Sequence, residues 1–388
     1  MTHIKRAVVD STQVDSELIK ALDKAGIAYD IDDKVATTPY YRDGKRNLVV
    51  TAKKGETLDT CATISDKYIC CNVKVLKSIS NCPYDCSYCF LQNYLNDGNT
   101  KVIGDDQALI DEVKEACGNE PQRIFRIGTW ELGDSLALEQ ETGQAGRLIK
   151  AFRDIDNAVL ELKTKSAIVD PILSCDHRQK TVVSWSLNAQ HIVDTQEHKT
   201  ARLQERLEAL KKVTDAGFLV GLHLDPMIYY DGWETGYESL VKQMISATHK
   251  DQIAWISLGS LRFNPEMKHK IQANFPASSI TYTEMILGDD GKMRYPKPLR
   301  MKMYRHILSL LCSELGIDDL SPQRNIDAPL FYFCMERWDV WDSLLGASPA
   351  SIYELDYLFA RSLQHRFFHH LPVPKQAFYT PKAEKPGW

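Results

Sequence analysis

The sequence predicts an α/β protein whose core is a partial (β/α)6 barrel of the TIM type. Between residues 71 and 275, short β-branched apolar runs alternate with longer amphipathic segments, a pattern typical of parallel βαβ units. The chain has 388 residues, of which 44% are apolar and 26% charged, so it can bury a core of that size. We therefore divide it into an N-terminal αβ extension (1–70), the barrel (71–275) and a C-terminal substrate-side, helical segment (276–388).

Six apolar runs are the expected barrel strands. They are "NVKVLKSIS" (72–80), "RIFRIGT" (123–129), "AVLELKTK" (158–165), "TVVSWSLN" (181–188), "LVGLHLDP" (219–226) and "IAWISLGSL" (253–261). Six units suit a partial barrel better than a closed eightfold one. Parallel barrels carry their active groups beyond the carboxyl ends of the strands, so we expect the site there.

Helical segments are expected between and after these strands. They lie near 105–117, 142–155, 199–216, 234–248 and 264–274. The third is the clearest, because Leu203, Leu207, Leu210 and Val213 recur at helical spacing before a stop at Gly217.

The flanking parts are less regular. In the extension, residues 7–26 predict a strand followed by a helix, and residues 46–56 predict a strand that ends in a turn. The last part contains a glycine-rich turn, a helix, and the run "PLFYFCMERWDVW" (329–341), which leads into a helical tail.

The charge and the hydropathy exclude some classes of protein. A formal net charge of -5 argues against a strongly basic nucleic-acid-binding protein, although it leaves room for a local basic groove. No run of 18 apolar residues is present, and the first 20 residues lack the pattern of a signal peptide. We therefore expect a cytoplasmic protein without membrane contact.

One loop carries the chemistry. The stretch "SNCPYDCSYCFLQNYL" (80–95) places Cys82, Cys86 and Cys89 within eight positions, directly after the first expected strand. Three thiolates so close together can bind three irons of a [4Fe-4S] cube and leave the fourth iron open for a ligand. A structural zinc site is the alternative. It needs four ligands, and Cys70 or Cys71 could supply the fourth.

The spacing C-x3-C-x2-C, with an aromatic residue before the last cysteine, resembles the signature of radical S-adenosylmethionine (SAM) enzymes. Further blocks of the chain, over roughly residues 70–310, resemble the spore photoproduct lyase family. These blocks are "NCPYDCSYCFLQ", "GDSLALE", "LELKTKSAIVD", "VVSWSLN", "GLHLDPMIYYDGWE", "AWISLGSLRF" and "DGKMRYPKPLRMKMY".

The resemblance implies a radical SAM enzyme, a carbon–carbon lyase that repairs thymine lesions in DNA. Cys82, Cys86 and Cys89 would bind the [4Fe-4S] cluster, which cleaves SAM to a 5′-deoxyadenosyl radical. The implied partners are DNA and an electron donor such as flavodoxin or ferredoxin.

The resemblance also implies residues that contact SAM or the substrate. For SAM they are Tyr88, which is also the catalytic candidate, and Gly128, Thr129, Glu131, Lys165, Ser186 and Asn188. For the substrate they are Asp225, Tyr229, Arg262, Arg294 and Tyr295. Each has a structural alternative: strand-end capping, ion pairing, helix packing or exposure on a loop.

The chain departs from the family at the residues that return hydrogen to the substrate. The family's donor cysteine follows the second strand, but this chain has no cysteine between Cys117 and Cys175. Cys175 or Cys334 would have to substitute for this donor. The chain also has Phe90 where the family has a relay tyrosine. Two other functions therefore stay open: radical SAM chemistry on a different nucleotide or small molecule, and a zinc-stabilised binding module without catalysis.

Overall fold

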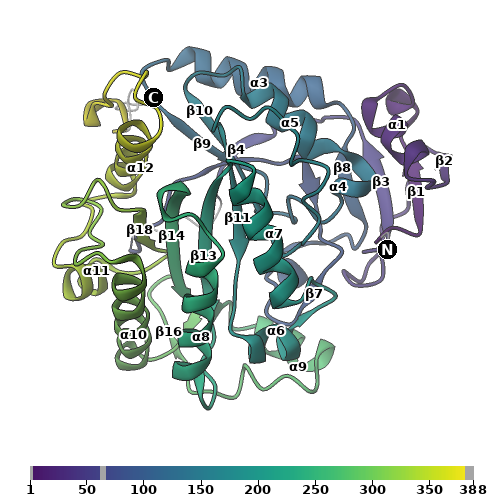
Figure 1. The fold of residues 1–388 in the computed structure, drawn as a ribbon. Coiled ribbons are helices and arrows are strands. Elements are labelled where there is room, and N and C mark those ends of the chain that lie inside the picture. The colour runs from purple at the N-terminus through teal and green to yellow at the C-terminus, as the bar shows by residue number, and fades with distance from the viewer. Residues whose placement is uncertain (1–2, 62–66, 381–388) are drawn as a thin grey trace, which may run out of the picture.

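The computed structural model describes residues 3–61 and 67–380, and its centre is a curled parallel sheet (Figure 1). The six predicted barrel strands are confirmed. They are β5 (Lys74–Leu76), β9 (Phe125–Gly128), β10 (Ala158–Thr164), β11 (Thr181–Ser186), β13 (Leu219–Met227) and β14 (Ile253–Ser260). They pair in parallel in this order, and β4 (Leu58–Thr60) adds an antiparallel edge beside β5. The sheet is a half-barrel, not a closed ring.

A strand that the sequence analysis did not predict extends the sheet beyond β14. β18 (Leu330–Phe333) pairs in parallel with β14, from Trp255 opposite Leu330 to Leu258 opposite Phe333. We had assigned this run to the C-terminal segment. All four of its residues are buried, and so short an apolar run shows no periodicity that separates a strand from a helix.

One isolated backbone bridge, which we call the seam, connects the segment ahead of β5 with the segment beyond β18 without closing the sheet. The amide of Ile69, ahead of β5, donates to the carbonyl of Glu336, beyond β18, over 2.9 Å. The seam brings residues near 70 and residues near 334 together although they are far apart in sequence. It thereby closes one side of the space at the carboxyl ends of the strands.

The predicted helices lie around the sheet and are confirmed. They are α3 (Asp106–Asn119), α5 (Gln144–Phe152), α7 (Leu203–Asp215), α8 (Trp233–Ser246) and α9 (Met267–Asn274). In α7 the predicted apolar face, from Leu203 to Val213, is buried. Figure 1 shows the C-terminal helices α10 (Lys297–Leu315), α11 (Trp338–Leu345) and α12 (Ile352–Arg366) on the side of the barrel opposite the extension.

A second, smaller sheet with its own core combines strands of the extension with strands from the start of the barrel region. In order, its strands are β2 (Tyr29–Ile31), β1 (Arg6–Val9), β3 (Asn47–Thr51), β8 (Thr100–Ile103) and β6 (Ile79–Ser80), and α1 (Glu17–Lys24) contributes to its core. The last two strands lie beyond residue 70. β6 and β8 flank the cysteine loop in sequence. The loop is therefore held between the small sheet and the barrel.

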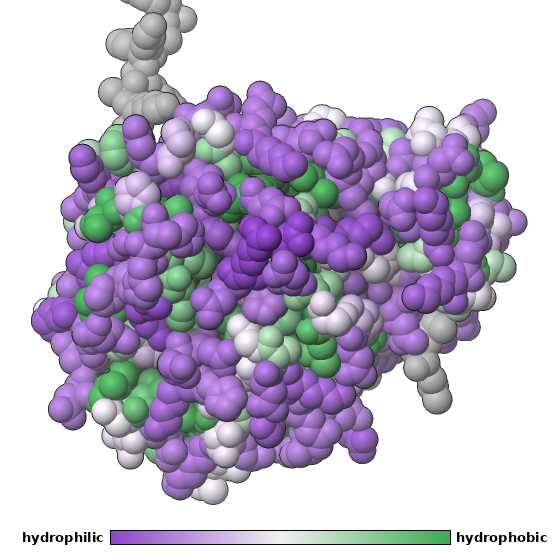
Figure 2. Space-filling view, turned by 45° about the horizontal axis from the view of Figure 1, so that its top comes forward, coloured by the Kyte–Doolittle hydropathy of each residue, from purple (hydrophilic) through white to green (hydrophobic). Residues whose placement is uncertain are grey.

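Figure 2 shows one face of the molecule, turned so that the top of Figure 1 comes forward. Hydrophilic residues cover most of this face, and hydrophobic residues form only small separate groups on it. None of the helices in the described ranges combines the length and the apolarity that crossing a membrane requires.

Candidate active site

A cavity of about 470 Å³ lies at the carboxyl ends of the barrel strands, which is large enough for a cofactor and part of a substrate. Cys82, Cys86 and Cys89 all line it, and so do Lys165 and Ser186. The position agrees with the predicted one, because a parallel barrel collects its strand-end residues at this rim.

Local hydrogen bonds shape the cysteine loop. The Cys82 amide donates to Asn81 Oδ1 over 2.8 Å, and the Cys89 amide donates to the Cys86 carbonyl over 3.1 Å. Asn81 has a φ of 70° and is fully buried, so a short polar side chain there fixes the start of the loop. In the middle of the loop, β7 (Asp85–Cys86) pairs antiparallel with β12 (Glu197–His198). In this pair of strands, Cys86 lies opposite Glu197.

The buried carboxylate of Asp85 ties the loop to the extension. Arg42 Nη2 lies 2.6 Å from Asp85 Oδ2, and Lys45 Nζ lies 3.6 Å from Oδ1, while Lys199 Nζ approaches Oδ2 to 3.3 Å. Burial opposes ionisation of Asp85, but the hydrogen bond from Arg42 and the lysine charges outweigh it and lower its pKa. The polar residues of the loop are therefore anchors, and its thiols face the cavity.

The three thiols of the loop offer a donor set that a cube can use. Among the residues described by the structure, no three His, Cys, Asp or Glu side chains converge on one metal position. A cube does not need convergence, because each thiolate binds a different iron. Burial raises the pKa of the Cys86 thiol to about 12, so thiolate ligation there depends on the positive charge of the iron. The donor set thus fits the cluster implied by the sequence.

Tyr88 lies against the cavity beside a buried ion pair. Its hydroxyl donates to Glu197, which pairs with Arg206 at 2.6 Å. The Lys165 ammonium lies 5.6 Å from the centre of the Tyr88 ring. The phenol is therefore fixed in place, and its ring forms part of the cavity wall.

Lys165 presents its ammonium to the cavity without an ion pair to any described residue. In the part of the chain that the structure describes, no carboxylate forms an ion pair with its ammonium. Burial opposes this charge, but the electrostatic influence of Cys86 and Glu197 outweighs it and raises the pKa of Lys165. Asp134 holds the backbone, since Asp134 Oδ2 accepts the Lys165 amide at 2.7 Å. Lys165 therefore stays charged and ready for an anionic ligand.

Three residues assigned to SAM do not line this cavity, whereas Glu131 does. A Cβ on Gly128 would lie 2.3 Å from Trp130 Nε1, so this glycine makes room for the Trp130 indole. Asn188 donates to the Pro226 carbonyl over 2.9 Å and accepts from the Tyr237 hydroxyl over 2.7 Å, so its polar atoms are already used.

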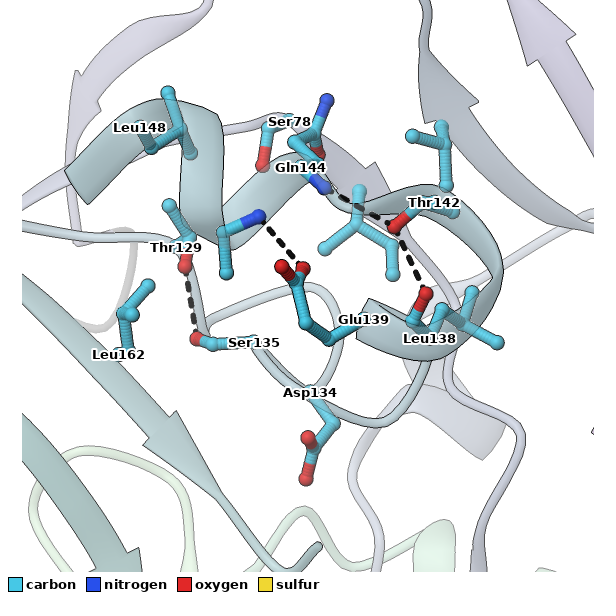
Figure 3. Close-up of a pocket in the computed structure, with 13 residues that line it drawn as sticks. Ser78, Thr129, Asp134, Ser135, Leu138, Glu139, Thr142, Gln144, Leu148 and Leu162 are labelled. Atoms are coloured by element: carbon cyan, nitrogen blue, oxygen red, sulfur yellow. Dashed lines mark hydrogen bonds between the residues drawn. The ribbon is translucent and has the colours of Figure 1, made fainter. Parts of the chain in front are cut away.

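Thr129, the third, faces a separate small cavity of about 20 Å³, which holds no more than a water molecule (Figure 3). Its hydroxyl donates to Ser135 Oγ over 2.8 Å. In the same cavity, Glu139 accepts the amides of Ala145 and Gly146 at the start of α5. Burial nevertheless raises the pKa of Glu139 to about 7. This cavity supports the fold and has no room for a ligand.

A buried network forms the floor of the large cavity. Glu161 Oε1 accepts from Ser184 (2.9 Å) and from Trp255 (3.1 Å), and His223 Nε2 lies 3.0 Å away; Oε2 accepts from Trp130 (3.0 Å). Burial lowers the pKa of His223 to about 4, so the imidazole is neutral at pH 7. The network rigidly connects β10, β11, β13 and β14 beneath the site.

Two of the expected substrate residues line the cavity and three do not. Arg262 Nη1 lies 2.9 Å from Asp225 Oδ1, and both side chains face the cavity. Tyr229 instead packs outside it against Trp233 and Tyr295.

Arg294 and Tyr295, which were expected to contact the substrate, are both buried and hydrogen-bonded within the protein. Arg294 is 2% exposed and pairs with Asp290. Tyr295 is fully buried, and its hydroxyl accepts the Tyr229 amide. Arg294 and Tyr295 thus support β17 (Met293–Arg294) and the start of α10 from within the protein.

The structure adds residues that the sequence analysis missed. Lys163 and Lys292 line the cavity without a carboxylate partner among the described residues, and Ser257 lines it with a buried hydroxyl. Phe90 and Tyr94 stand exposed at its edge. Lys163 lies two residues before Lys165 at the end of β10 (Ala158–Thr164), and this alternation was a signal for the first of these. The other residues, Lys292, Ser257, Phe90 and Tyr94, reach the cavity only through tertiary contacts, which no local sequence pattern shows.

Comparisons with known proteins agree on one family. A family model described as spore photoproduct lyase matches residues 29–303. Spore photoproduct lyase of Bacillus subtilis (strain 168) is 25% identical over 258 residues, which are 66% of this chain and 72% of that protein. The enzyme of the same name from Clostridium acetobutylicum is 24% identical over 242 residues, covering 61% and 69%.

A solved structure shows the same fold. It is a double mutant of spore photoproduct lyase with bound AdoMet and dinucleoside spore photoproduct. The TM-score is 0.71 at 20% identity, over 85% of this chain and 98% of that one.

Proposed function

The chain belongs to the spore photoproduct lyase family, and we propose that it is a radical SAM lyase that repairs thymine lesions in DNA. Cys82, Cys86 and Cys89 would hold a [4Fe-4S] cluster, reduced by a flavodoxin or ferredoxin. When bound, the cluster and SAM supply a 5′-deoxyadenosyl radical that takes a hydrogen atom from the lesion. The observation that carries the proposal is that the three cysteines and the unpaired Lys165 line one cavity.

The protein's own task is to orient SAM and exclude water. The Lys165 ammonium is suited to the SAM carboxylate through a charge-assisted hydrogen bond. Ser186, at the end of β11, offers a hydroxyl to the ribose, and the fixed ring of Tyr88 offers a flat surface to the adenine. Glu131 lies on the same wall and suits the SAM amino group.

A second group of cavity residues suits a nucleic acid. Lys163 and Lys292 bring positive charge to the cavity, which a phosphodiester would neutralise. Phe90 is 45% exposed and Tyr94 56%, and their rings lie 6.1 Å apart at the cavity edge. Exposed aromatic rings of this kind can stack on unpaired bases. The protein therefore needs no large basic surface to bind a lesion.

The test is reversal of the lesion by the anaerobically reconstituted, reduced protein. With SAM and a dinucleotide spore photoproduct, it should form 5′-deoxyadenosine and two thymidine units. The Cys89→Ala variant should form neither, and Cys175→Ala, which changes a thiol that does not line the cavity, should match wild type. An intact lesion in spite of 5′-deoxyadenosine formation would reject thymine-lesion repair.

That last outcome would favour a second candidate, radical SAM chemistry on a different nucleotide or small molecule. The absence of a cysteine between Cys117 and Cys175, together with Phe90, supports this candidate. The zinc-stabilised module has no such support, since no three ligands converge among the described residues.

A further inference from the structure

The cavity contains four thiols that the cluster loop does not use. They are Cys61, Cys70, Cys71 and Cys334, and they lie around the seam between Ile69 and Glu336. A carbon radical left on a substrate is quenched by a hydrogen atom from an S–H bond. The useful thiol must keep its proton, face the cavity and be held in a fixed orientation.

The thiols ahead of β5 meet these conditions poorly. Cys71 is 4% exposed and hydrogen-bonded to Cys70, so its sulfur is held within this group and not presented to a substrate. Cys70 is 1% exposed and hydrogen-bonded to both Cys61 and Cys71, so its thiol is engaged within this group.

Cys334 meets all three conditions. It follows β18 at the carboxyl edge of the sheet, where parallel barrels carry reactive groups, and it remains partly exposed on the cavity wall. Burial and the charge of Asp225 raise the pKa of its thiol, so the S–H bond persists at neutral pH.

Neighbouring residues hold the Cys334 sulfur. Arg262 Nη2 donates to it over 3.1 Å, while the same guanidinium binds Asp225 at 2.9 and 3.3 Å. A Cβ on Gly259 would lie 2.4 Å from Asp225 Oδ1 and 3.0 Å from Arg262 Nη1, so the glycine leaves room for this arrangement. The thiol is therefore oriented by a built cluster.

A second observation points to a ligand at the same end of the cavity. Ser257 lies on β14, opposite Tyr332 of β18, and is 1% exposed. Ser257 is one of the residues that line the cavity, and its buried hydroxyl has no hydrogen-bond partner within the described part of the chain. A buried polar group without a partner is costly unless a ligand or water satisfies it. A substrate seated here would satisfy Ser257 and lie next to β18 and its cysteine.

We propose that Cys334 is the catalytic hydrogen-atom donor of this protein, replacing the cysteine that the chain lacks after its second strand. The inference rests on the proposed function. In the step, the S–H bond of Cys334 breaks and a C–H bond forms on the substrate radical. One hydrogen atom, with its electron, moves to carbon; the substrate is reduced and the sulfur becomes a thiyl radical.

Solvent deuterium tests the step, because a thiol proton exchanges with D2O. The reconstituted wild-type protein, given SAM and dinucleotide spore photoproduct in D2O, should place deuterium in the repaired thymidine. Cys334→Ala should lower the yield of repaired thymidine by about tenfold or more while still forming 5′-deoxyadenosine. Cys334→Ser should behave alike, because an O–H bond is too strong to give its hydrogen to a carbon radical. Cys175→Ala is the matched control and should retain both yield and deuterium.

A second readout does not depend on turnover. Labelling of Cys334 by methylmercury, which displaces the proton of an un-ionised thiol, followed by mass spectrometry, should slow when the dinucleotide spore photoproduct binds, while labelling of Cys312, outside the cavity, should not change. Repair with undiminished deuterium in Cys334→Ala, or labelling of Cys334 that ignores the dinucleotide, would overturn the inference alone. Failure of the wild-type protein to reverse the lesion would overturn the proposed function and this inference together.

Discussion

Arg42 Nη2 lies 2.6 Å from Asp85 Oδ2, and this contact joins the N-terminal extension to the loop that carries the three cysteines. Asp85 is 1% exposed, so the carboxylate depends on its cationic partners for compensation. The extension, which has no catalytic signature in its sequence, thus positions the loop that carries the three cysteines.

Replacement of Asp85 by Ala should therefore damage both the fold and the cluster site. The charges of Arg42 and Lys45 lose their counter-ion, and the free energy of unfolding should fall by about 3 kcal/mol. Iron content per chain after reconstitution should fall with it. Asp59→Asn is the control. Its exposed pair with Lys77 should contribute less than about 1 kcal/mol to the free energy of unfolding. Normal iron content in Asp85→Ala would show that the loop does not need this anchor.

Lys165 and Lys163 occupy the same strand end but should serve different ligands. Lys165→Met removes a charge-assisted hydrogen bond and should weaken SAM binding roughly 10- to 100-fold, measured by equilibrium dialysis. Lys163→Met should leave SAM affinity within about threefold and weaken binding of the dinucleotide instead. Equal losses of SAM affinity in the two variants would contradict the division of the cavity residues into two groups.

Substitution of Gly128 tests the packing of Trp130 against the buried network beneath the site. In Gly128→Ala, the new Cβ meets Trp130 Nε1 and disturbs the bond from Trp130 to Glu161, so the free energy of unfolding should fall by about 2 kcal/mol. Gly118→Ala makes the matched change in open space on α3, where Ala should stabilise the helix by up to about 1 kcal/mol. Chemical denaturation of both variants measures the difference. If both changes had the same sign, packing against Trp130 would not be the reason for Gly128.

From the lowered pKa of His223 we predict how the free energy of unfolding depends on pH. Its pKa is about 4 in the folded protein because of burial, against 6.5 for the free group, so the unfolded chain binds the extra proton between these values. The contribution of His223 is therefore complete above pH 6.5 and is lost as the pH falls towards 4. The difference amounts to on the order of 3 kcal/mol. His223→Gln should flatten the dependence of unfolding free energy on pH in this window. An unchanged slope would mean that His223 is not buried in its neutral form.

The strands and the cluster loop were predictable because their signals are local. β-branched runs revealed six parallel strands, and the spacing of Cys82, Cys86 and Cys89 pointed to the loop that lines the cavity. β18 was not predictable, because four consecutive buried residues show no hydrophobic periodicity. Its place beside β14 also depends on a long-range pairing.

The cavity wall was predictable only in part. Lys165 and Ser186 were found at strand ends, but Thr129 and Asn188 are also strand-end residues and face other partners. Successive side chains alternate between the two faces of a strand, so a shift of one residue decides which of them reach the cavity. Cys334 gains its position from Arg262, 72 residues earlier, which no local pattern shows.

The most direct test of the account is electron paramagnetic resonance of the anaerobically reconstituted, dithionite-reduced protein, recorded with and without SAM. Three ligating cysteines and an open iron predict a one-electron-reduced cubane signal whose g values shift when SAM binds. They also predict that the shift needs more SAM in Lys165→Met. A spectrum that SAM leaves unchanged, or a protein that takes up zinc in place of iron and sulfide, would contradict the claim that this loop presents a cluster to SAM.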